Sequence, residues 1–328
     1  MNRNTRMFAA AALAAAAALL TGCGAGTATE TVGAAPVAEN KPVVDKKNWP
    51  KATPEHGLAK GLSLPLETYM QTYQDTVTLD QASRRLQEKC MADFGIAMEL
   101  PLAGATPPPN DNDANMERRY GLTDRDAAAR YGYGLPEELT RQVRQKMPDL
   151  TDEQVQVLTG HSKPERPNTP GAAASAQRAP ESYKGRKIHQ GGCVGWAKGK
   201  VKKPAQDDLN LVSELNGNSF LQSMRAPAVR QAMSAWSQCM KTKGYTAPTP
   251  FEATDIVPRA EGGPASQKEI AVALAEIDCK AETRLVPIWF AEETKIQQAQ
   301  IAEHRTELNG VRARNDSAVA AATAELAG

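Results

Sequence analysis

The chain has five cysteines, of which Cys23 belongs to the N-terminal signal described below. The other four, Cys90, Cys193, Cys239 and Cys279, are the candidates for disulfide bonds. In a chain that is exported, an even number of cysteines is typical of a disulfide framework, and here it predicts two bridges. No two of them have the CxxC spacing of zinc ribbons and thioredoxin-type redox sites. The cysteines at 90 and 239 each stand near the end of a predicted helix. If each pairs with the next cysteine along the chain, the bridges are Cys90–Cys193 and Cys239–Cys279, although the connectivity stays open at this point.

A basic segment follows the Pro- and Ala-rich residues 161–182. Residues 184–203 carry seven cations and no acidic residue, and Tyr183 and Trp196 are interleaved with them. On a chain held at a membrane, such a segment would bind anionic lipid headgroups or anionic wall polymers. The alternative is a solvated loop that leads into a helix. The seven cations are Lys184, Arg186, Lys187, Lys198, Lys200, Lys202 and Lys203.

Other motifs give weaker signals of chemistry. Residues 111–115 provide the first three ligand positions of a calcium loop, but Met116 and Leu122 stand where glycine and a bidentate glutamate are needed. His189 and Cys193 are four residues apart, and a zinc site would need two further ligands that the sequence does not offer. No nucleophile, metalloprotease or phosphate-loop motif is present. We therefore expect no metal or cofactor, and the sequence leans away from an enzyme.

The N-terminus has the shape of a secretory signal. A positively charged start is followed by a 14-residue apolar run, Met7 to Leu20, which is too short to span a bilayer. The next residues, Leu20-Thr21-Gly22-Cys23, resemble a bacterial lipobox. This resemblance implies that Cys23 is acylated and that cleavage precedes it, which would anchor the chain on the extracytoplasmic face of the cell membrane. The alternative is an ordinary signal peptide in which Cys23 has no role.

Composition and periodicity indicate a mainly α-helical fold with a small core. Only 5% of the 328 residues are aromatic, 22 are proline, and patterns with strand periodicity are almost absent. Capping motifs at Thr78, Thr151 and Ser266 predict three helix starts. The last of these helices is expected to be long, to run beyond residue 300 and to kink at Pro287 before an Ala-rich tail. We expect disulfide-stapled helical domains joined by long Pro- and Gly-rich loops.

The chain organisation follows from these signals. The expected segments are a signal peptide at 1–22, a lipidated tether at 23–47, an N-terminal helical part at 48–160, a linker at 161–182 and a C-terminal helical part at 183–328. Removal of the signal leaves 37 basic and 38 acidic residues, since Arg3 and Arg6 leave with it. This near balance argues against a nucleic-acid-binding protein, which would carry a strong basic excess.

Four short segments add a resemblance: 118–122 (RRYGL), 191–193 (GGC), 236–240 (WSQCM) and 278–280 (DCK). Together they resemble uncharacterised secreted and lipid-anchored proteins of high-GC Gram-positive (actinobacterial) bacteria, over most of residues 65–310. The resemblance implies an extracytoplasmic setting and supports the disulfides, and it implies no known activity.

The expected function is therefore a noncatalytic binding or structural module of the cell envelope. An anionic wall polymer or an envelope protein would be its partner besides the membrane. Trp289 and Phe290 could anchor such a protein partner, or could instead pack on the helix expected at 228–243. Two alternatives remain, a solute-binding lipoprotein of a transporter and a cell-wall hydrolase. The first would need two α/β lobes, and the second a cleft with converging carboxylates or a Ser–His pair.

Overall fold

Side-chain caps set the ends of several helices in the computed structural model. It describes residues 44–136, 139, 145–162, 178, 180–202, 205–258 and 263–328. The signal peptide, the acylation site, residues 24–43 of the expected tether, most of the expected linker and Lys203 lie outside the described residues. Helix α4, Asp152–Thr159, begins at the capping box predicted at Thr151 and ends at Gly160, whose φ is 77°. Ser266 likewise caps α8, Gln267–Thr283, by accepting from the backbone N of Glu269.

The described residues are mainly α-helical, as the sequence predicted. The strands among them form one two-residue antiparallel hairpin, β1 (Ser182–Tyr183) and β2 (Arg186–Lys187). No helix among the described residues is both long and apolar enough to cross a bilayer. The remaining α-helices are α1 (Tyr73–Asp93), α2 (Arg125–Tyr131), α5 (Gly192–Val201), α6 (Gln206–Arg225), α7 (Pro227–Thr242), α9 (Leu285–Glu303) and α10 (Arg305–Ala327).

Helix α1 begins earlier than predicted. The expected start at Thr78 is wrong, because Thr72 and Asp75 already form a capping box that starts the helix at Tyr73. The Thr78 hydroxyl instead donates to the carbonyl of Gln74 one turn back, at 2.8 Å, which is a common use of threonine inside a helix. The cap therefore lies at Thr72, six residues before the predicted cap at Thr78.

The long kinked helix expected from residue 266 is three helices in the structure. The chain leaves the helical conformation at Arg284, whose φ of 55° and ψ of 32° are left-handed, and leaves it again at His304. Pro287 causes no kink, because it lies in the first turn of α9, where a backbone N–H has no partner within the helix. The Ala-rich tail is not irregular but forms α10, which packs its small residues against α1 and α5.

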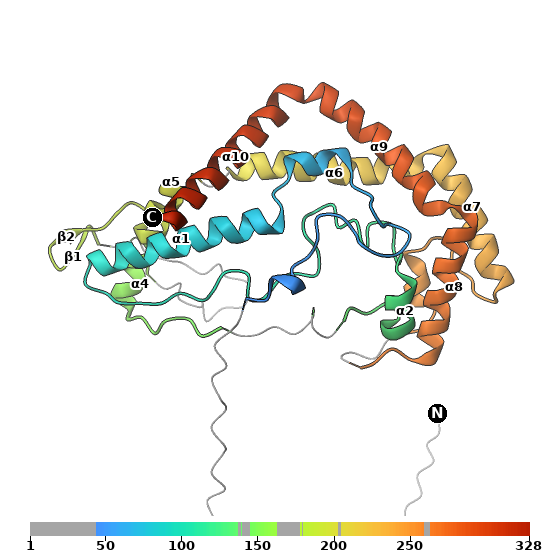
Figure 1. The fold of residues 1–328 in the computed structure, drawn as a ribbon, viewed down its shortest axis with the longest axis horizontal. Coiled ribbons are helices and arrows are strands. Elements are labelled where there is room, and N and C mark those ends of the chain that lie inside the picture. Colours follow the sequence, from blue (N-terminus) through green and yellow to red (C-terminus); the bar gives the residue numbers. More distant parts are fainter. Residues whose placement is uncertain are drawn as a thin grey trace, which may run out of the picture. The chain divides into compact units, whose positions relative to one another are not determined.

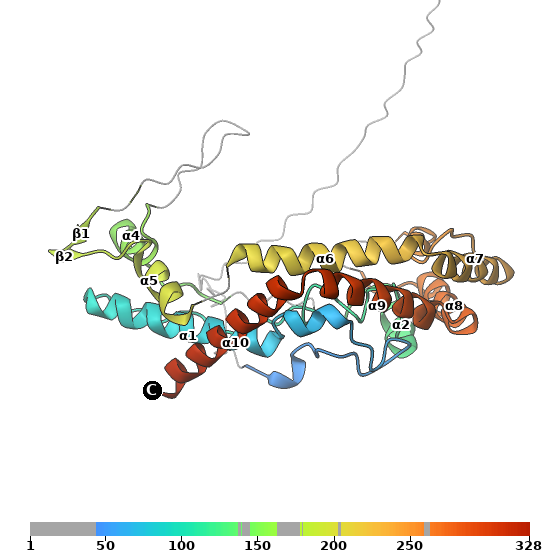
Figure 2. The ribbon, with the colours of Figure 1, turned by 90° about the horizontal axis from the view of Figure 1, so that it is seen from above.

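Both parts of the chain on either side of the expected linker belong to one unit, Lys41–Gly328. Within it α1 lies beside α5 and α10, and α6 lies beside α9 (Figures 1 and 2). Helices α7, α8 and α9 surround the largest core cluster, whose biggest buried side chains are Trp236, Trp289 and Tyr120. The last residues of the expected tether are also part of this unit, since Val44 packs against the cluster of Trp49 and Tyr73 and the Lys46 ammonium lies 5.4 Å from the centre of the Trp49 ring.

Trp289 is a core residue and not a partner anchor. Its side chain is fully buried, its ring stacks on Phe220 at 5.4 Å, and its Nε1 donates to Ser223 Oγ at 2.8 Å. The packing alternative is therefore confirmed for Trp289, while Phe290 is partly buried against the same cluster.

Helices α4 and α5 meet through glycines. The end of α4 at Gly160 touches Gly191 and Gly192 at the start of α5, and a Cβ on Gly192 would come within 2.5 Å of Gly160 N and Leu158 O. Its φ of 65° also favours glycine. The carbonyl end of one helix thus faces the amide end of the next, which is a favourable arrangement of the two helix dipoles. This contact sets where α5 and its basic residues lie.

Candidate functional site

Two disulfide bridges fix the elements that carry the candidate site. Cys90 at the end of α1 is paired with Cys193 at the start of α5, and Cys239 of α7 is paired with Cys279 of α8. The Cα–Cα distance is 5.6 Å in both pairs, and all four side chains are buried. Pairing each helix-end cysteine with the next cysteine along the chain is therefore the connectivity that the structure has.

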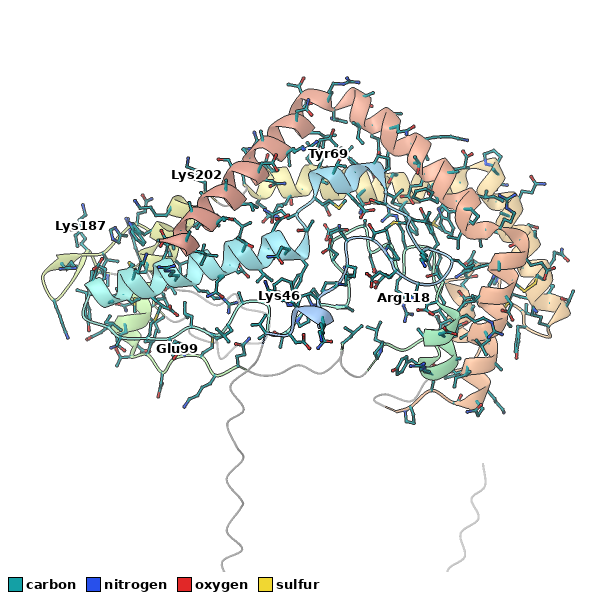
Figure 3. All side chains as sticks on the ribbon, viewed as in Figure 1. Lys46, Tyr69, Glu99, Arg118, Lys187 and Lys202 are labelled. Carbon is teal, nitrogen blue, oxygen red and sulfur yellow. A yellow bond between two sulfur atoms is a disulfide. The ribbon has the colours of Figure 1, made fainter. Side chains whose placement is uncertain are left out.

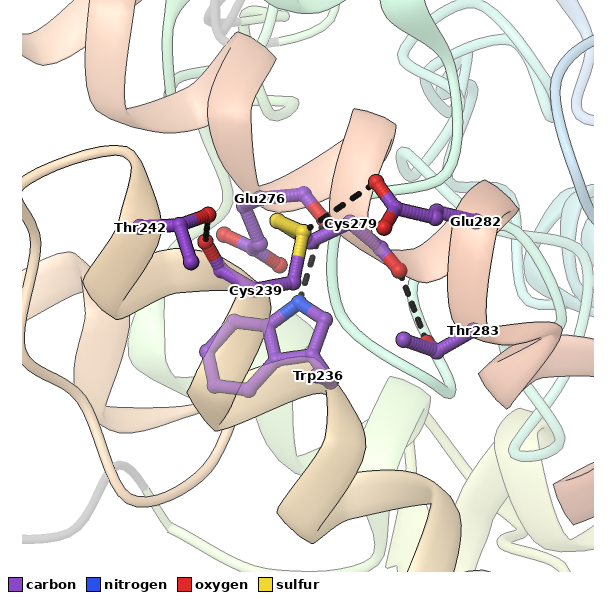
Figure 4. Close-up of a disulfide and its surroundings, with 7 residues drawn as sticks. All are labelled: Trp236, Cys239, Thr242, Glu276, Cys279, Glu282 and Thr283. Atoms are coloured by element: carbon purple, nitrogen blue, oxygen red, sulfur yellow. Dashed lines mark hydrogen bonds between the residues drawn. A yellow bond between two sulfur atoms is a disulfide. The ribbon is translucent and has the colours of Figure 1, made fainter.

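The second bridge lies against Trp236 (Figure 4). The indole Nε1 donates to the carbonyl of Glu276 at 3.1 Å, which ties α7 to α8 beside the bridge. Thr242 and Thr283 each donate to the carbonyl of a bridged cysteine at 2.7 Å. This bridge is shielded from solvent, since Cys239 is 8% exposed and Cys279 is fully buried, as is typical of a structural disulfide.

The predicted basic residues lie on the hairpin and on α5. Lys184 and Gly185 form the two-residue turn between β1 and β2, with φ of 46° and 78°, as a type I′ turn requires. Figure 3 places Lys187 on the hairpin and Lys202 beyond α5. The six described cations, Lys184, Arg186, Lys187, Lys198, Lys200 and Lys202, are all exposed.

These cations divide into two groups around α5. Lys198 projects from one side of α5, whereas Lys202 follows the helix as its C-cap, with a left-handed φ of 49°. Lys200 is two residues from Lys198 and therefore projects from a different side, which it shares with Trp196. Its ammonium lies 5.6 Å from the centre of the Trp196 ring. The sequence interval 184–203 thus contains two surfaces, of which the second includes aromatic rings.

Four rings form a continuous line beside this second surface, and we call Tyr183, Phe94, His189 and Trp196 the aromatic row. Successive ring centres are 6.5 Å, 6.3 Å and 5.7 Å apart. The Lys184 ammonium lies 5.2 Å from the Tyr183 ring, and the Arg186 guanidinium lies 5.9 Å from the Phe94 ring. The sequence indicated Tyr183 and Trp196, but the sequence pattern gave no sign of Phe94, which comes from α1's end.

The carboxylates near this surface are few among the described residues. Glu325 of α10 forms an ion pair with Lys89 at 2.5 Å, and the charges of Lys89, Arg85 and Lys200 contribute to lowering its pKa, after a hydrogen bond from Lys89. Glu181 is exposed at the base of the hairpin, where its carbonyl accepts from the backbone N of Ile188 at 2.9 Å. Asp93, which precedes Phe94, is exposed as well, so the six cations outnumber the carboxylates named here, Asp93, Glu181 and Glu325.

A second feature is a buried polar cluster that sequence reasoning missed. The Glu293 carboxylate is fully buried and accepts hydrogen bonds from Arg119, from Tyr120 Oη at 2.9 Å and from Ser219 Oγ at 2.8 Å. The Arg119 Nε–Glu293 Oε2 distance is 3.0 Å. Burial and then the Glu293 charge raise the pKa of the Tyr120 hydroxyl. With its carboxylate saturated by protein donors, this cluster joins α6, α9 and the loop before α2.

A buried lysine lies in a similar setting on α8. The Lys280 ammonium donates to Glu276 Oε1 at 2.5 Å and to the carbonyl of Leu122 at 2.8 Å. Both side chains are fully buried, and burial lowers the pKa of Lys280 although the Glu276 charge opposes that effect. Through its bond to Leu122, this pair holds the 118–123 loop against α8.

The cleft next to this loop has a volume of about 290 Å³ and is lined by Glu117, Arg118, Asp124 and His56. Partial loss of hydration raises the pKa of Glu117 and lowers that of Arg118. Asp124 Oδ1 is committed to the cap of α2, where it accepts from the backbone N of Asp126 and Ala127. One carboxyl with a raised pKa is a feature of acid catalysis; of the two other carboxylates that line the cleft, Asp124 caps α2 and Glu55 is exposed.

Two aspartates of the incomplete calcium motif, Asp111 and Asp113, hydrogen-bond to other elements of the fold. Asp111 accepts from the backbone N of Tyr73 at 2.7 Å, and Asp113 accepts from Ser213 Oγ at 2.8 Å. Among the described residues, no group of three or more His, Cys, Asp or Glu side chains is arranged to hold a metal ion. The polar-loop interpretation of residues 111–115 therefore agrees with the contacts.

Comparison of the chain with protein-family models, with curated proteins and with solved structures finds no match.

Proposed function

We propose that the chain is an extracytoplasmic lipoprotein, anchored in the cell membrane through acylated Cys23, that acts as a noncatalytic binding module of the cell envelope. Its partner would be an anionic wall polymer bound at the basic surface of the hairpin and α5. The observation that carries the binding proposal is the set of six exposed cations held there on rigid elements. Long-range attraction by such a surface raises the local concentration of a polyanion.

The export part of the proposal is supported by the lipobox and by the two bridges. Disulfides form and persist in oxidising compartments outside the cytosol. Both bridges join elements far apart in sequence, with separations of 103 and 40 residues. A chain that depends on two such bridges fits an extracytoplasmic location.

The alternatives have less support. A solute-binding lipoprotein would show α/β lobes, whereas the strands of the described residues make only the β1–β2 hairpin. A glycan hydrolase needs two carboxylates that act on one bond. In the cleft beside Glu117, the carboxylate of Asp124 caps α2.

Neutralisation of the basic surface is expected to weaken wall binding. The test compares the triple variant Lys198→Gln, Lys200→Gln, Lys202→Gln with the wild-type protein in cosedimentation with purified cell wall at low salt. Because each cation near an anionic surface contributes about 1 kcal/mol, the apparent affinity should fall at least about tenfold. A matched triple, Lys241→Gln, Lys243→Gln, Lys268→Gln, removes three exposed charges from α7 and α8 and should bind like the wild type. Equal binding by both triples would refute the proposal.

Anchoring is tested separately at Cys23. The Cys23→Ser variant is expected to move from the membrane fraction to the medium or the soluble envelope fraction, because the nucleophilic thiol that carries the lipid is lost. Globomycin should block processing of the wild-type precursor. Retention of Cys23→Ser in the membrane fraction, or processing that globomycin leaves unchanged, would contradict lipid anchoring.

A further inference from the structure

We propose that the aromatic row preorganises three cations, Lys184, Arg186 and Lys200, into a binding site for the phosphate groups of a linear polymer. This inference rests on the proposed function and names the ligand class of the same surface. Each of the three cations lies over a ring of the row, at 5.2 Å, 5.9 Å and 5.6 Å from the ring centre. The rings therefore act as supports for cations.

The contacts of the Trp196 ring favour a role in holding a cation over a role in stacking on a ligand. His189 stacks on this indole with an interplanar angle of 24°, and Lys200 lies over the same ring system. Phe94 is 7% exposed, and Arg186 lies over it. A sugar or base that sought an open ring face would have to displace these contacts first. The row therefore presents three cations to solvent, beside the exposed His189 and the partly exposed Tyr183 and Trp196.

The first disulfide restricts the movement of the aromatic row, because it joins the end of α1 to the start of α5. Phe94 follows Cys90 by four residues and Trp196 follows Cys193 by three, so one bridge joins the two segments that supply these rings. The hairpin that brings Tyr183 is closed by the Ile188 N–Glu181 O hydrogen bond at 2.9 Å. A lysine side chain loses rotamer freedom when it binds. Cations already held on rigid rings lose less of it on binding an anion.

Charge complementarity selects the ligand. Among the described residues, none of these three cations forms an ion pair with a carboxylate, while other surface cations such as Lys89, Arg125 and Lys295 do. Phosphate groups are suitable partners because they accept charge-assisted hydrogen bonds from both ammonium and guanidinium groups. Since the row runs from the hairpin past the end of α1 to α5, a chain of phosphates can follow its three cations.

The test uses inorganic polyphosphate as the probe and two double variants with the same loss of charge. Arg186→Gln with Lys200→Gln removes cations of the row, and Lys198→Gln with Lys202→Gln removes two exposed cations of α5 and its C-cap that lie over no ring of the row. We expect the first pair to weaken polyphosphate binding about tenfold more than the second at low salt, measured by calorimetry or fluorescence titration.

A ring substitution tests the supporting role at constant charge. Trp196→Leu should weaken binding about 2- to 5-fold, and Trp196→Phe should restore it, because a smaller ring still attracts the cation. Circular dichroism and thermal unfolding check that both variants fold. If Trp196→Leu does not fold, Tyr183→Leu with Tyr183→Phe replaces it at the hairpin.

The outcomes separate this inference from the proposed function. If both double variants weaken binding equally and Trp196→Leu binds like the wild type, the surface binds polyanions by charge alone and the inference is wrong while the proposed function stands. If phosphatidylglycerol vesicles bind as tightly as polyphosphate and respond equally to both double variants, the ligand is a membrane plane, and this also overturns the inference. If no variant changes binding to polyphosphate or to cell wall, both proposals fail.

Discussion

Replacement of Arg119 by methionine is expected to lower the free energy of unfolding by about 3–5 kcal/mol. The guanidinium neutralises Glu293, which is fully buried, and also donates to the carbonyls of Ala114 at 3.0 Å and Asn216 at 2.9 Å. Removal of the cation leaves a carboxylate in the core without its counter-charge and leaves the two carbonyls without this donor. Urea denaturation followed by circular dichroism at neutral pH measures the loss.

Two controls separate the buried charge from a general loss of packing. The double variant Arg119→Met with Glu293→Leu removes both charges, and it should recover part of the lost stability because no uncompensated charge stays in the core, although Tyr120 and Ser219 lose their acceptor. Lys295→Met breaks the exposed pair with Glu292, in which the lysine side chain is 68% exposed, and should cost less than about 1 kcal/mol. A loss below about 1 kcal/mol for Arg119→Met would show that the cluster does not hold the fold.

Removal of the Cys90–Cys193 bridge is expected to cost about 4–5 kcal/mol. The bridge closes a loop of 103 residues, so the double variant Cys90→Ala, Cys193→Ala gives the unfolded chain much more conformational freedom. Both side chains are also buried in the cluster that holds Phe94 and Ile188, so their loss removes packed atoms. Thermal and urea unfolding of the oxidised proteins measure the difference.

The second bridge provides the internal comparison. The Cys239→Ala, Cys279→Ala variant opens a loop of 40 residues, and the chain-entropy argument predicts a slightly smaller cost of about 4 kcal/mol. Reduction of the wild-type protein should destabilise it by more than either variant alone. If the Cys90–Cys193 variant were as stable as the oxidised wild type, the bridge would not contribute to the folded state.

Local signals in the sequence were enough to predict several helices and both bridges. The helix that ends at Gly244 was predicted from Val229, Ala232, Met233 and Trp236, and α7 buries these residues. Two bridges were predicted from the even number of cysteines, while their connectivity stayed open; the structure has the pairing of each helix-end cysteine with the next one. These features depend on caps, on spacing along one helix and on order along the chain, all of which the sequence displays directly.

The buried side of α8 was not predictable in this way. Periodicity placed Ile270, Leu274 and Ala281 in the core, but the first two are partly exposed and Ala281 is exposed. The helix buries Glu276 and Lys280 instead, because they pair with each other and Lys280 also bonds the carbonyl of Leu122. A pattern that counts apolar residues treats charged residues as exposed, so a buried ion pair shifts the apparent face of the helix.

The sequence predicted residues 184–203 as the candidate binding segment, but it did not predict which residues of this segment lie together in space. Arg186 and Lys200 are 14 residues apart, and what relates them is a line of rings that includes Phe94 from another part of the chain. The break at Arg284 was missed for a similar reason, since arginine carries no local signal for a left-handed conformation. Contacts between distant segments decide both features.

The return of α10 to α1 has a consequence for biogenesis. Arg85 Nη1 donates to the carbonyl of Leu326 at 2.9 Å across 241 positions, and Ala318 and Ala322 complete the cluster that contains Leu79 and Leu86. A polypeptide that emerges from a ribosome or a translocation channel with its N-terminus first must wait for its last turns before α1 can bury this face. Until then the nascent chain carries an unsatisfied apolar stripe, which delays native assembly and makes incomplete translation products targets for proteases.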